Sequence, residues 1–428
     1  MTRHSAVLAV LLPALATALL AGSAVFLASW AADHPGQKFQ ILPASLVKPN
    51  ATPAVANEST DLPRPAGAMP EVPKGFAVSV FADNLSDARW MAVAPNGDVF
   101  LAEPPIGYTA KPGGKITLLR DSNNDGKADQ RFTFLPASAG FVYPHGLAFH
   151  EGYLYVGDVR GIWRFPYQDG QTAAGKAEKV TTKVADLAPK NGHITRNIAF
   201  APDGTLYLAL GSRDNISDFK PGAQVFKINP DGSMSEFASG IRNPVGIAFQ
   251  PGTSNLYVVT NERDGLGDDL PPDYMTSVKP GGFYGYPYAY IGKNPDPVWG
   301  AKDPGGKIAS TITPDVLFHA HSAPTGLAFY TGTSFPAEYR GDAFVSLHGS
   351  WNSGSPTGYK VVRVHFTGGK PDNGYENFAT GFWNGMGNAG EPAKVWGRPV
   401  GLAVAKDGSL LIADDVANVV WRVAYTGK

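Results

Sequence analysis

The chain alternates apolar and polar positions over short stretches, and one such pattern recurs six times. Each copy has a small apolar strand, a turn that often carries Asn-Gly or Asp-Gly, and a second apolar strand. The copies span residues 90–103, 145–158, 197–212, 245–262, 326–349 and 400–415. Alternation with a period of two is typical of β-strands, and glycine-containing turns accept the positive φ of tight hairpins. Each copy is therefore predicted to be a β-hairpin.

Further apolar stretches, at residues 116–119, 161–165, 225–228 and 361–364, extend the hairpins toward four-stranded sheets. A sheet of this size cannot bury both faces alone, so neighbouring sheets are expected to stack into a closed ring. The 50 glycines, 36 prolines and 17% charged residues also favour many short strands and turns over long helices. The predicted fold class is all-β, with a six-bladed β-propeller over residues 74–428.

The N-terminal 32 residues carry Arg3 and His4, then a long apolar stretch, then the small residues Ala31 and Ala32. This order is typical of an export segment, either a cleaved signal peptide or an uncleaved signal anchor. We therefore expect a periplasmic or otherwise extracytoplasmic protein, anchored to the inner membrane only if the segment is retained. Residues 33–73 are rich in proline and lack apolar periodicity, so they are predicted to be a linker.

The charge balance and the absence of cysteine exclude several classes of function. The net charge is -1 and no basic run follows the N-terminus, so a nucleic-acid partner is not expected. Without cysteine there can be no disulfide, no thiolate zinc site and no C-x-x-C-H haem attachment. A redox role would therefore need a cofactor held without sulfur, and a separate electron acceptor such as a cytochrome or a quinone.

In a propeller the first strand of each blade lines the central channel, so the residues just before those strands gather at one mouth. These positions carry Arg89, His145, His193, Arg196, Arg242, Asn243, His321 and Arg398. His348, which follows a second strand, is a further candidate. Taken alone, each of these residues could equally be a structural residue that packs at a strand end. Four arginines in one funnel repel each other unless an anion lies among them. Because no glycine-rich phosphate loop is present, the sequence favours carboxylates as that anion.

Two loops combine carboxylates with glycine, a pattern typical of calcium sites but also of solvated turns. The candidate ligands of the first loop are Asp264, Gly265, Asp268 and Asp269. Those of the second loop are Asp121, Asn123, Asp125, Lys127 and Asp129. In the second loop Phe132 replaces the bidentate glutamate of a helix-loop-helix sensor, so a structural ion between strands is expected there.

Several longer motifs resemble the sorbosone and glucose dehydrogenase family of soluble quinoproteins, which includes the pyrroloquinoline quinone-dependent pyranose dehydrogenases. The motifs are GHITR at 192–196, IRNP at 241–244, NERDGLGDDLPPDYMTSVKPGGFYGYPY at 261–288, HGSWN at 348–352 and GRP at 397–399. The resemblance runs from about residue 75 to the C-terminus. It implies a propeller enzyme that binds pyrroloquinoline quinone (PQQ) and calcium and oxidises an aldose or a sugar-derived aldehyde.

The resemblance also implies roles for single residues. His193 matches the family's general base, which takes the proton of the sugar hydroxyl while hydride passes to the quinone. Arg242 and Asn243 match residues that hold the quinone and polarise its reacting oxygen. Arg398 matches a carboxylate-binding arginine. The loop around Asp264 matches a calcium loop beside the cofactor, where the ion acts as a Lewis acid.

Other positions depart from the family pattern or lie outside it. His348 stands where the glucose dehydrogenases carry a lysine toward the cofactor, which puts the electronics of the cofactor in question. Trp351 is a candidate for stacking on the cofactor or the sugar, or for packing in a blade. The assignments of Arg89, His145, Arg196 and His321 rest on the repeat alone.

Two other classes of function stay open at the level of sequence. A propeller lactonase or esterase would need an axial metal ion that activates water, and would leave the arginines without a partner. A propeller binding module would make the convergence of His193 and the arginines incidental.

Overall fold

The computed structural model describes residues 33–108, 110–184, 187, 192–384 and 390–428. The predicted export segment, residues 1–32, lies outside the described residues. Within those ranges no helix is both long enough and apolar enough to span a bilayer. Helical structure there consists of short 3-10 turns at Pro43–Ser45, Ala137–Ala139, Gly300–Lys302, Lys307–Ser310 and Ala337–Tyr339.

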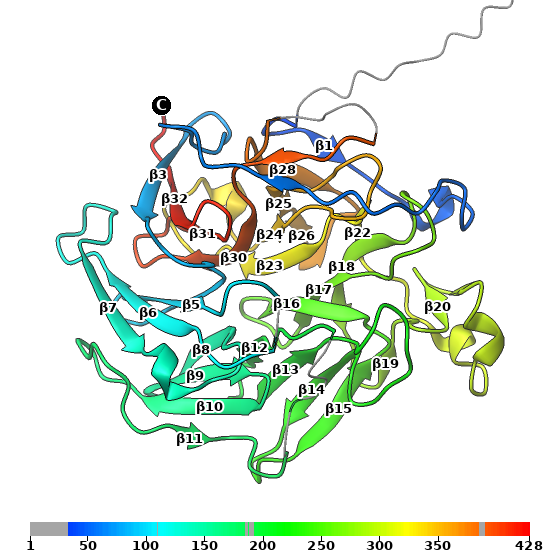
Figure 1. Ribbon diagram of the computed structural model, residues 1–428, viewed down its shortest axis with the longest axis horizontal. Helices are drawn as coiled ribbons and strands as arrows, with labels where there is room; N and C mark the ends of the chain where they lie inside the picture. The colour runs from blue at the N-terminus through cyan, green and yellow to red at the C-terminus, as the bar shows by residue number, and fades with distance from the viewer. Residues whose placement is uncertain (1–32, 109, 185–186, 188–191, 385–389) are drawn as a thin grey trace, which may run out of the picture. The chain divides into compact units, whose positions relative to one another are not determined.

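Six sheets, each with a core of four antiparallel strands, confirm the predicted six-bladed β-propeller (Figure 1). The first blade is β4–β7 (Trp90–Val93, Val99–Glu103, Lys115–Arg120, Gln130–Leu135). The second is β8–β11 (Gly146–His150, Tyr153–Asp158, Gly161–Pro166, Glu178–Lys179). The third is β12–β15 (Ile198–Phe200, Leu206–Leu210, Gln224–Ile228, Met234–Ser239), with β19 (Gly282–Phe283) added parallel to β15.

The last three blades continue the ring. The fourth is β16, β17, β18 and β22 (Asn243–Phe249, Leu256–Asn261, Pro272–Val278, Val316–Ala320). The fifth is β23, β24, β25 and β28 (Pro324–Phe329, Ala343–Leu347, Lys360–Val364, Tyr375–Ala379). The sixth is β30, β31, β32 and β3 (Pro399–Val404, Leu410–Asp414, Val419–Tyr425, Phe76–Ala82). Two small hairpins, β20–β21 (Ala289–Tyr290, Asn294–Pro295) and β26–β27 (Phe366–Thr367, Lys370–Pro371), lie in the connections.

The ring is closed by pairing between the two ends of the propeller sequence. The first strands of the blades, β4, β8, β12, β16, β23 and β30, contact their neighbours in this order, and β30 contacts β4. β3 pairs with β32, with Phe76 opposite Tyr425, so an N-terminal strand completes the last blade. Pairing the outermost strand in this way ties both ends of the chain into one sheet.

Apolar side chains of facing blades fill the space between the sheets. Phe100 and Phe134 of the first blade pack with Leu147 and Leu154 of the second, and all four are buried. Each blade thus buries both faces only against its neighbours, which is why the repeat produces a ring. Where the second and third blades approach most closely, a Cβ on Gly146 would lie 2.1 Å from a backbone oxygen of the next blade, so only glycine fits.

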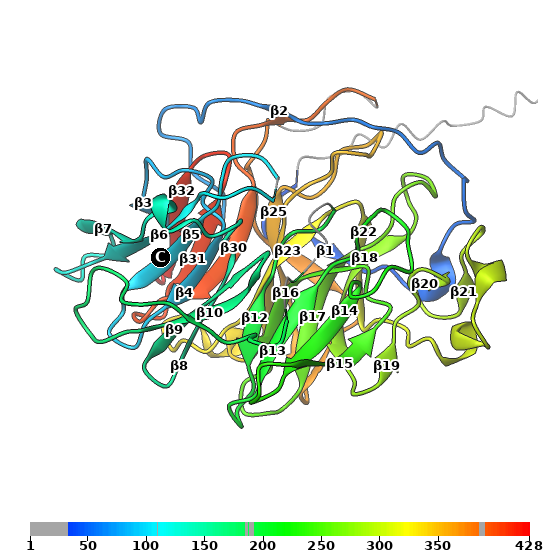
Figure 2. The ribbon, with the colours of Figure 1, turned by 60° about the horizontal axis from the view of Figure 1, so that its bottom comes forward.

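Residues 33–73 pack along the propeller. β1 (Lys38–Phe39) pairs with β28, and β2 (Thr60–Asp61) runs parallel to β29 (Lys394–Val395). Figure 2 shows the part that carries β2 crossing above the blades at one end of the ring. The proline-rich composition of this stretch predicts a linker. Composition could not predict these contacts, because the partners are backbone groups of loops distant in the sequence.

Candidate functional site

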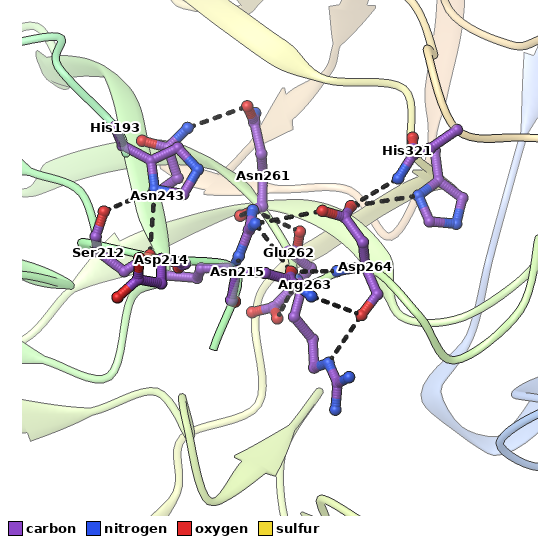
Figure 3. A network of polar contacts seen from close by, with 12 residues as sticks. His193, Ser212, Asp214, Asn215, Asn243, Asn261, Glu262, Arg263, Asp264 and His321 are labelled. Atoms are coloured by element: carbon purple, nitrogen blue, oxygen red, sulfur yellow. Dashed lines mark hydrogen bonds and ion pairs between the residues drawn. The ribbon is translucent and has the colours of Figure 1, made fainter. Parts of the chain in front are cut away.

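A cavity of about 520 Å³ opens on the propeller axis, at the face where the first strands of the blades begin. Its walls include nine of the ten residues proposed from sequence for catalysis or cofactor binding: Arg89, His145, His193, Arg242, Asn243, His321, His348, Trp351 and Arg398. They come together because equivalent strand ends of a propeller meet at one mouth. Figure 3 shows a network of polar contacts among residues of the third and fourth blades, several of which, among them His193, Asn243 and Asp264, line this cavity.

His193 precedes the first strand of the third blade and is fixed through one ring nitrogen. Its Nδ1 lies 2.8 Å from the backbone oxygen of Ser212 and 3.1 Å from the Ser212 hydroxyl. A carbonyl oxygen can only accept, so Nδ1 carries the proton and Nε2 is the free acceptor. Burial, and the charge of Arg242, lower the pKa of His193 to about 3. The imidazole is therefore neutral at physiological pH and able to accept a proton at Nε2.

Gly211 lies directly behind His193 and is a site residue that the sequence analysis missed. A Cβ at this position would lie 2.5 Å from the Cβ of His193 and 2.5 Å from Oδ1 of Asn243. Only glycine allows both side chains to keep their places. The available signal is a glycine directly after the second strand of the third blade, which is ambiguous because many strand ends carry glycine.

Arg242 is held by the loops around it. Its Nε donates to the backbone oxygen of Asn215 at 2.9 Å, and Nη1 donates to that of Glu262 at 2.8 Å. Nη2 donates to Oδ1 of Asn215 at 3.0 Å and lies 3.4 Å from Oδ2 of Asp264. The neighbouring Asn243 donates from Nδ2 to Oδ1 of Asn261 at 3.2 Å. The guanidinium is thus oriented by several groups and partly neutralised by one carboxylate.

Opposite this network, Asp415 joins residues of the fifth and sixth blades and of the first. Its Oδ2 lies 3.0 Å from Nη2 of Arg89 and 2.9 Å from Nε2 of His348. Arg398 donates from Nε to the backbone oxygen of His348 at 2.9 Å, and from Nη2 to that of Gly349 at 2.8 Å. Burial and Arg398 lower the pKa of His348 to about 4, against the opposing effect of Asp415. Asp415 was also missed from sequence.

The tenth predicted residue, Arg196, does not line the cavity. It is fully buried, and its guanidinium donates to the backbone oxygens of Leu187, His193 and Thr195 at 2.8–2.9 Å. The expectation of four like charges in one funnel is therefore wrong, because this arginine turns away from the axis into the loop that carries His193. Arg89 and Arg242 are each paired with carboxylates, so no free anion is required to stabilise them.

We expect Arg196→Met to destabilise the fold by about 3 kcal/mol or more, because it leaves three buried carbonyl oxygens without donors. Urea denaturation followed by circular dichroism measures this change. Arg340→Met, at an exposed position, is the matched control and should change the free energy of unfolding by less than about 0.5 kcal/mol. An Arg196→Met protein of unchanged stability would contradict the packing role.

A third wall of the cavity is acidic. Glu262, Asp264 and Asp273 line it beside Asn261. Burial raises the pKa of Glu262 to about 7, and burial together with Glu262 and Asp264 raises that of Asp273 to about 8. Asp273 is thus largely protonated near neutral pH, and Glu262 is about half protonated. Oε1 of Glu262 is buried and has no hydrogen-bond partner among the described residues.

The first predicted calcium loop does not converge on one point. Asp264 faces the cavity, where its Oδ1 accepts from Nδ2 of Asn352 at 2.6 Å, whereas Asp268 accepts from the backbone nitrogen of Gly354. Gly265 and Asp269 are exposed. In the part of the chain that the structure describes, no three His, Asp or Glu side chains are arranged to hold a metal ion. The side chains of these residues are thus not gathered around one point, and calcium binding by this loop stays a prediction.

The second predicted calcium loop, residues 121–129, connects β6 to β7 and does not line the axial cavity. Asp121 accepts hydrogen bonds from the backbone nitrogens of Asp125 and Gly126, and Asp125 accepts from that of Lys127. Asp129 accepts from the backbone nitrogen of Ser122. Oδ1 of Asn123 also accepts from the backbone nitrogen of Asp125. A structural ion stays a prediction for this loop.

Comparison with known proteins places these observations in context. The sequence matches the family described as "Domain of unknown function (DUF7133)" over residues 63–350, and the TrAA12-like family over residues 306–426. An uncharacterized protein of Borreliella burgdorferi is 30% identical over 369 residues, which cover 83% of this chain and 90% of that protein. The pyrroloquinoline quinone-dependent pyranose dehydrogenase of Coprinopsis cinerea is 25% identical over 243 residues, which cover 43% of this chain and 30% of that protein.

Two solved structures share the fold. A Trichoderma reesei protein of Carbohydrate-Active Enzymes Family AA12 has a TM-score of 0.69 at 18% identity, covering 86% of this chain and all of that one. The holo form of the pyranose dehydrogenase PQQ domain from Coprinopsis cinerea has a TM-score of 0.66 at 21% identity, covering 85% and 98%. The resemblance to soluble quinoproteins identified from the motifs is thereby confirmed.

Proposed function

This chain belongs to the family described as Domain of unknown function (DUF7133), and we propose that it is a PQQ-dependent dehydrogenase of aldoses or sugar-derived aldehydes. One observation carries the proposal: a neutral histidine, whose Nε2 has no hydrogen-bond partner among the described residues, lines the same cavity as Arg89, Arg242 and Arg398. The relatives support the coarser statement of an oxidoreductase of the PQQ-dependent sugar dehydrogenase type.

The cavity fits a planar ligand that carries several carboxylates. Its volume lies in the range of pockets that enclose a small organic ligand. Arg398 uses two of its five N–H groups on carbonyl oxygens, so the remaining three can reach an acidic ligand from a fixed guanidinium. Oδ1 of Asn243 is buried and has no hydrogen-bond partner among the described residues. Arg89, Arg242, Asn243 and Arg398 would hold the cofactor.

When bound there, PQQ would supply a carbonyl carbon that accepts hydride from the substrate. His193 would accept the hydroxyl proton of the substrate at Nε2, while its Nδ1–H continues to donate to the Ser212 carbonyl oxygen. Arg242 would stabilise developing negative charge, because loop oxygens fix its guanidinium before the reaction begins.

The central experiment adds PQQ, with and without calcium, to the purified protein and follows dye reduction across a panel of sugars and aldehydes. Saturable PQQ binding with sugar-dependent dye reduction is expected. Hydrolysis of lactones or esters without PQQ binding would favour the lactonase alternative. If the protein neither binds PQQ nor turns over any of these compounds, the binding-module alternative is favoured.

Arg398→Met is expected to weaken PQQ binding about 10- to 100-fold, because it removes charge-assisted hydrogen bonds to a carboxylate. Titration of PQQ against tryptophan fluorescence measures the Kd. Arg398→Lys keeps the positive charge and should bind with intermediate affinity. An unchanged Kd in Arg398→Met, with normal thermal stability, would remove this residue from the cofactor site.

Calcium remains part of the proposal as a structural ion in the loop of residues 121–129. Calcium is expected to raise the Tm relative to a chelator, because an ion that binds only the folded state stabilises it. Differential scanning calorimetry checks this, with Asp121→Asn and Asp125→Asn expected to abolish the response. Equal Tm values with calcium and with chelator would contradict the site.

We also propose that the electrons pass to a separate cytochrome or quinone, and that the protein works outside the cytoplasm. Both proposals rest on the sequence: it has no haem attachment motif, and its first 32 residues are typical of an export segment. Cell fractionation with detection of the mature N-terminus tests the location. An intact first segment in the membrane fraction would identify an anchor, and its loss would identify a cleaved signal.

A further inference from the structure

The segment of residues 57–62 lies at the rim of the axial cavity and is fixed to loops of the propeller; we call it the rim segment. The backbone nitrogen of Asn57 donates to the oxygen of Trp351 at 2.8 Å, and that of Thr60 to the oxygen of Ala393 at 2.7 Å. The nitrogen of Leu62 donates to the oxygen of Val395 at 2.7 Å. The rim segment is therefore held along its length by backbone hydrogen bonds.

Asn57 anchors this segment through its side chain as well. It is only 8% exposed, and its Nδ2 donates to the backbone oxygen of Ser353 at 2.9 Å and to that of Glu391 at 3.2 Å. A buried amide with two carbonyl partners fixes the position of the residues that follow it. The rim segment thus has a defined place relative to the cavity.

Three side chains of the rim segment line the cavity: Glu58, Ser59 and Asp61. Among the described residues neither carboxylate forms an ion pair. Both residues are exposed, and Oδ1 of Asp61 accepts a hydrogen bond from the Ser59 hydroxyl at 3.4 Å. Trp351 and Tyr108 line the same opening and are 47% and 44% exposed, which is unusual for large aromatic side chains.

Deeper in the same cavity, two buried polar atoms have no hydrogen-bond partner among the described residues. They are Oδ1 of Asn243 and Oε1 of Glu262, and each belongs to a residue that is 4% exposed. Unpaired buried polar atoms of this kind indicate that a polar ligand or water completes the site. The rim carboxylates therefore stand at the entrance to a ligand site and not on an ordinary acidic surface.

We propose that Glu58, Ser59 and Asp61 are specificity-determining residues, which accept hydrogen bonds from hydroxyl groups of a neutral sugar ring and disfavour acidic sugars. This inference rests on the proposed sugar oxidation at the same site. Aromatic side chains bind the apolar face of a ring, and carboxylates accept hydrogen bonds from its hydroxyl groups. Two negative charges at the rim disfavour an anionic sugar bound beside them and favour a cationic one.

The test compares glucose, glucuronate and glucosamine as substrates of the wild type and of the double variant Glu58→Gln, Asp61→Asn. Removing both charges is expected to raise kcat/KM for glucuronate, relative to that for glucose, about tenfold. The same change should lower kcat/KM for glucosamine relative to that for glucose. Glu151→Gln removes an exposed carboxylate that does not line the cavity and should leave both ratios unchanged.

Asn57→Ala provides a second, uncharged test of the rim segment. Loss of the amide is expected to release the segment, raising KM for glucose several-fold while kcat stays within twofold. Hydrogen exchange of residues 57–62 should increase in the same variant. Unchanged KM together with increased exchange would overturn the proposal, since the freed segment would then make no difference to binding.

Saturation-transfer NMR of the same three sugars, with the cofactor-free protein, separates this inference from the proposed function. A charge-dependent shift in sugar affinity without any PQQ-dependent oxidation would support the rim proposal and reject the dehydrogenase. Normal oxidation with ratios unchanged in the double variant would reject the rim proposal alone. Absence of binding by all three sugars would reject the rim proposal as well.

Discussion

His193→Ala is expected to lower kcat for sugar oxidation by about 10²- to 10⁴-fold, the usual contribution of a positioned general base. The expectation follows from Nδ1 being committed to the Ser212 carbonyl oxygen, which leaves Nε2 as the acceptor. Steady-state dye reduction gives kcat, and tryptophan fluorescence titration gives the Kd of PQQ. That Kd should change by less than about threefold, because the arginines and Asn243 remain.

The control and a rescue experiment make this prediction specific. His34→Ala removes an exposed histidine that does not line the cavity and should have no effect on kcat. Added imidazole should restore part of the activity of His193→Ala, because a small base can occupy the vacated space. Wild-type turnover in a variant that binds PQQ normally would show that another group takes the proton.

Gly211→Ala is expected to lower kcat by about 10²-fold, although Gly211 does not line the cavity. The new Cβ would lie 2.5 Å from both His193 and Asn243, so at least one of these side chains must move. Displacement of a catalytic group by about 1 Å costs roughly this factor in rate. If Asn243 is the side chain that moves, the Kd of PQQ should rise as well.

The backbone of Gly211 is not in the left-handed region, so an alanine there is not strained by its own φ. The effect should therefore be one of space, and a crystal structure of the variant would show which side chain shifts. Gly175→Ala is the matched control, because a Cβ there meets nothing within 4 Å. Activity of Gly211→Ala within twofold of the wild type would mean that the site tolerates the displacement.

The six-fold sequence repeat predicted most of the site, because a propeller brings equivalent positions of all its blades together at the axis. Residues before the first strand of each blade and residues after the second strand meet at one mouth, so nine of the candidate residues line a single cavity. Arg196 is the exception, since the same sequence position can direct a side chain toward the axis or back into its own loop. Its three carbonyl partners come from the loop itself, and no periodicity encodes that choice.

The residues that the sequence did not reveal are those whose partners are remote in the chain. Asp415 pairs with Arg89 because ring closure brings the last blade against the first. Glu58, Ser59 and Asp61 reach the cavity because a segment before the propeller binds to loops of the fifth and sixth blades. Such pairings depend on which distant backbone groups are left unpaired, and a local pattern does not contain that information.

By itself the sequence determined the six hairpins, the closed ring and the identity of most axial side chains, because alternation and turn residues act over a few positions. The tertiary structure alone decided which charges are compensated, which carboxyls stay protonated and which segment forms the rim of the cavity. The physical reason is that burial and electrostatic pairing depend on distance in space. In a ring, the residues closest in space at the axis come from every blade.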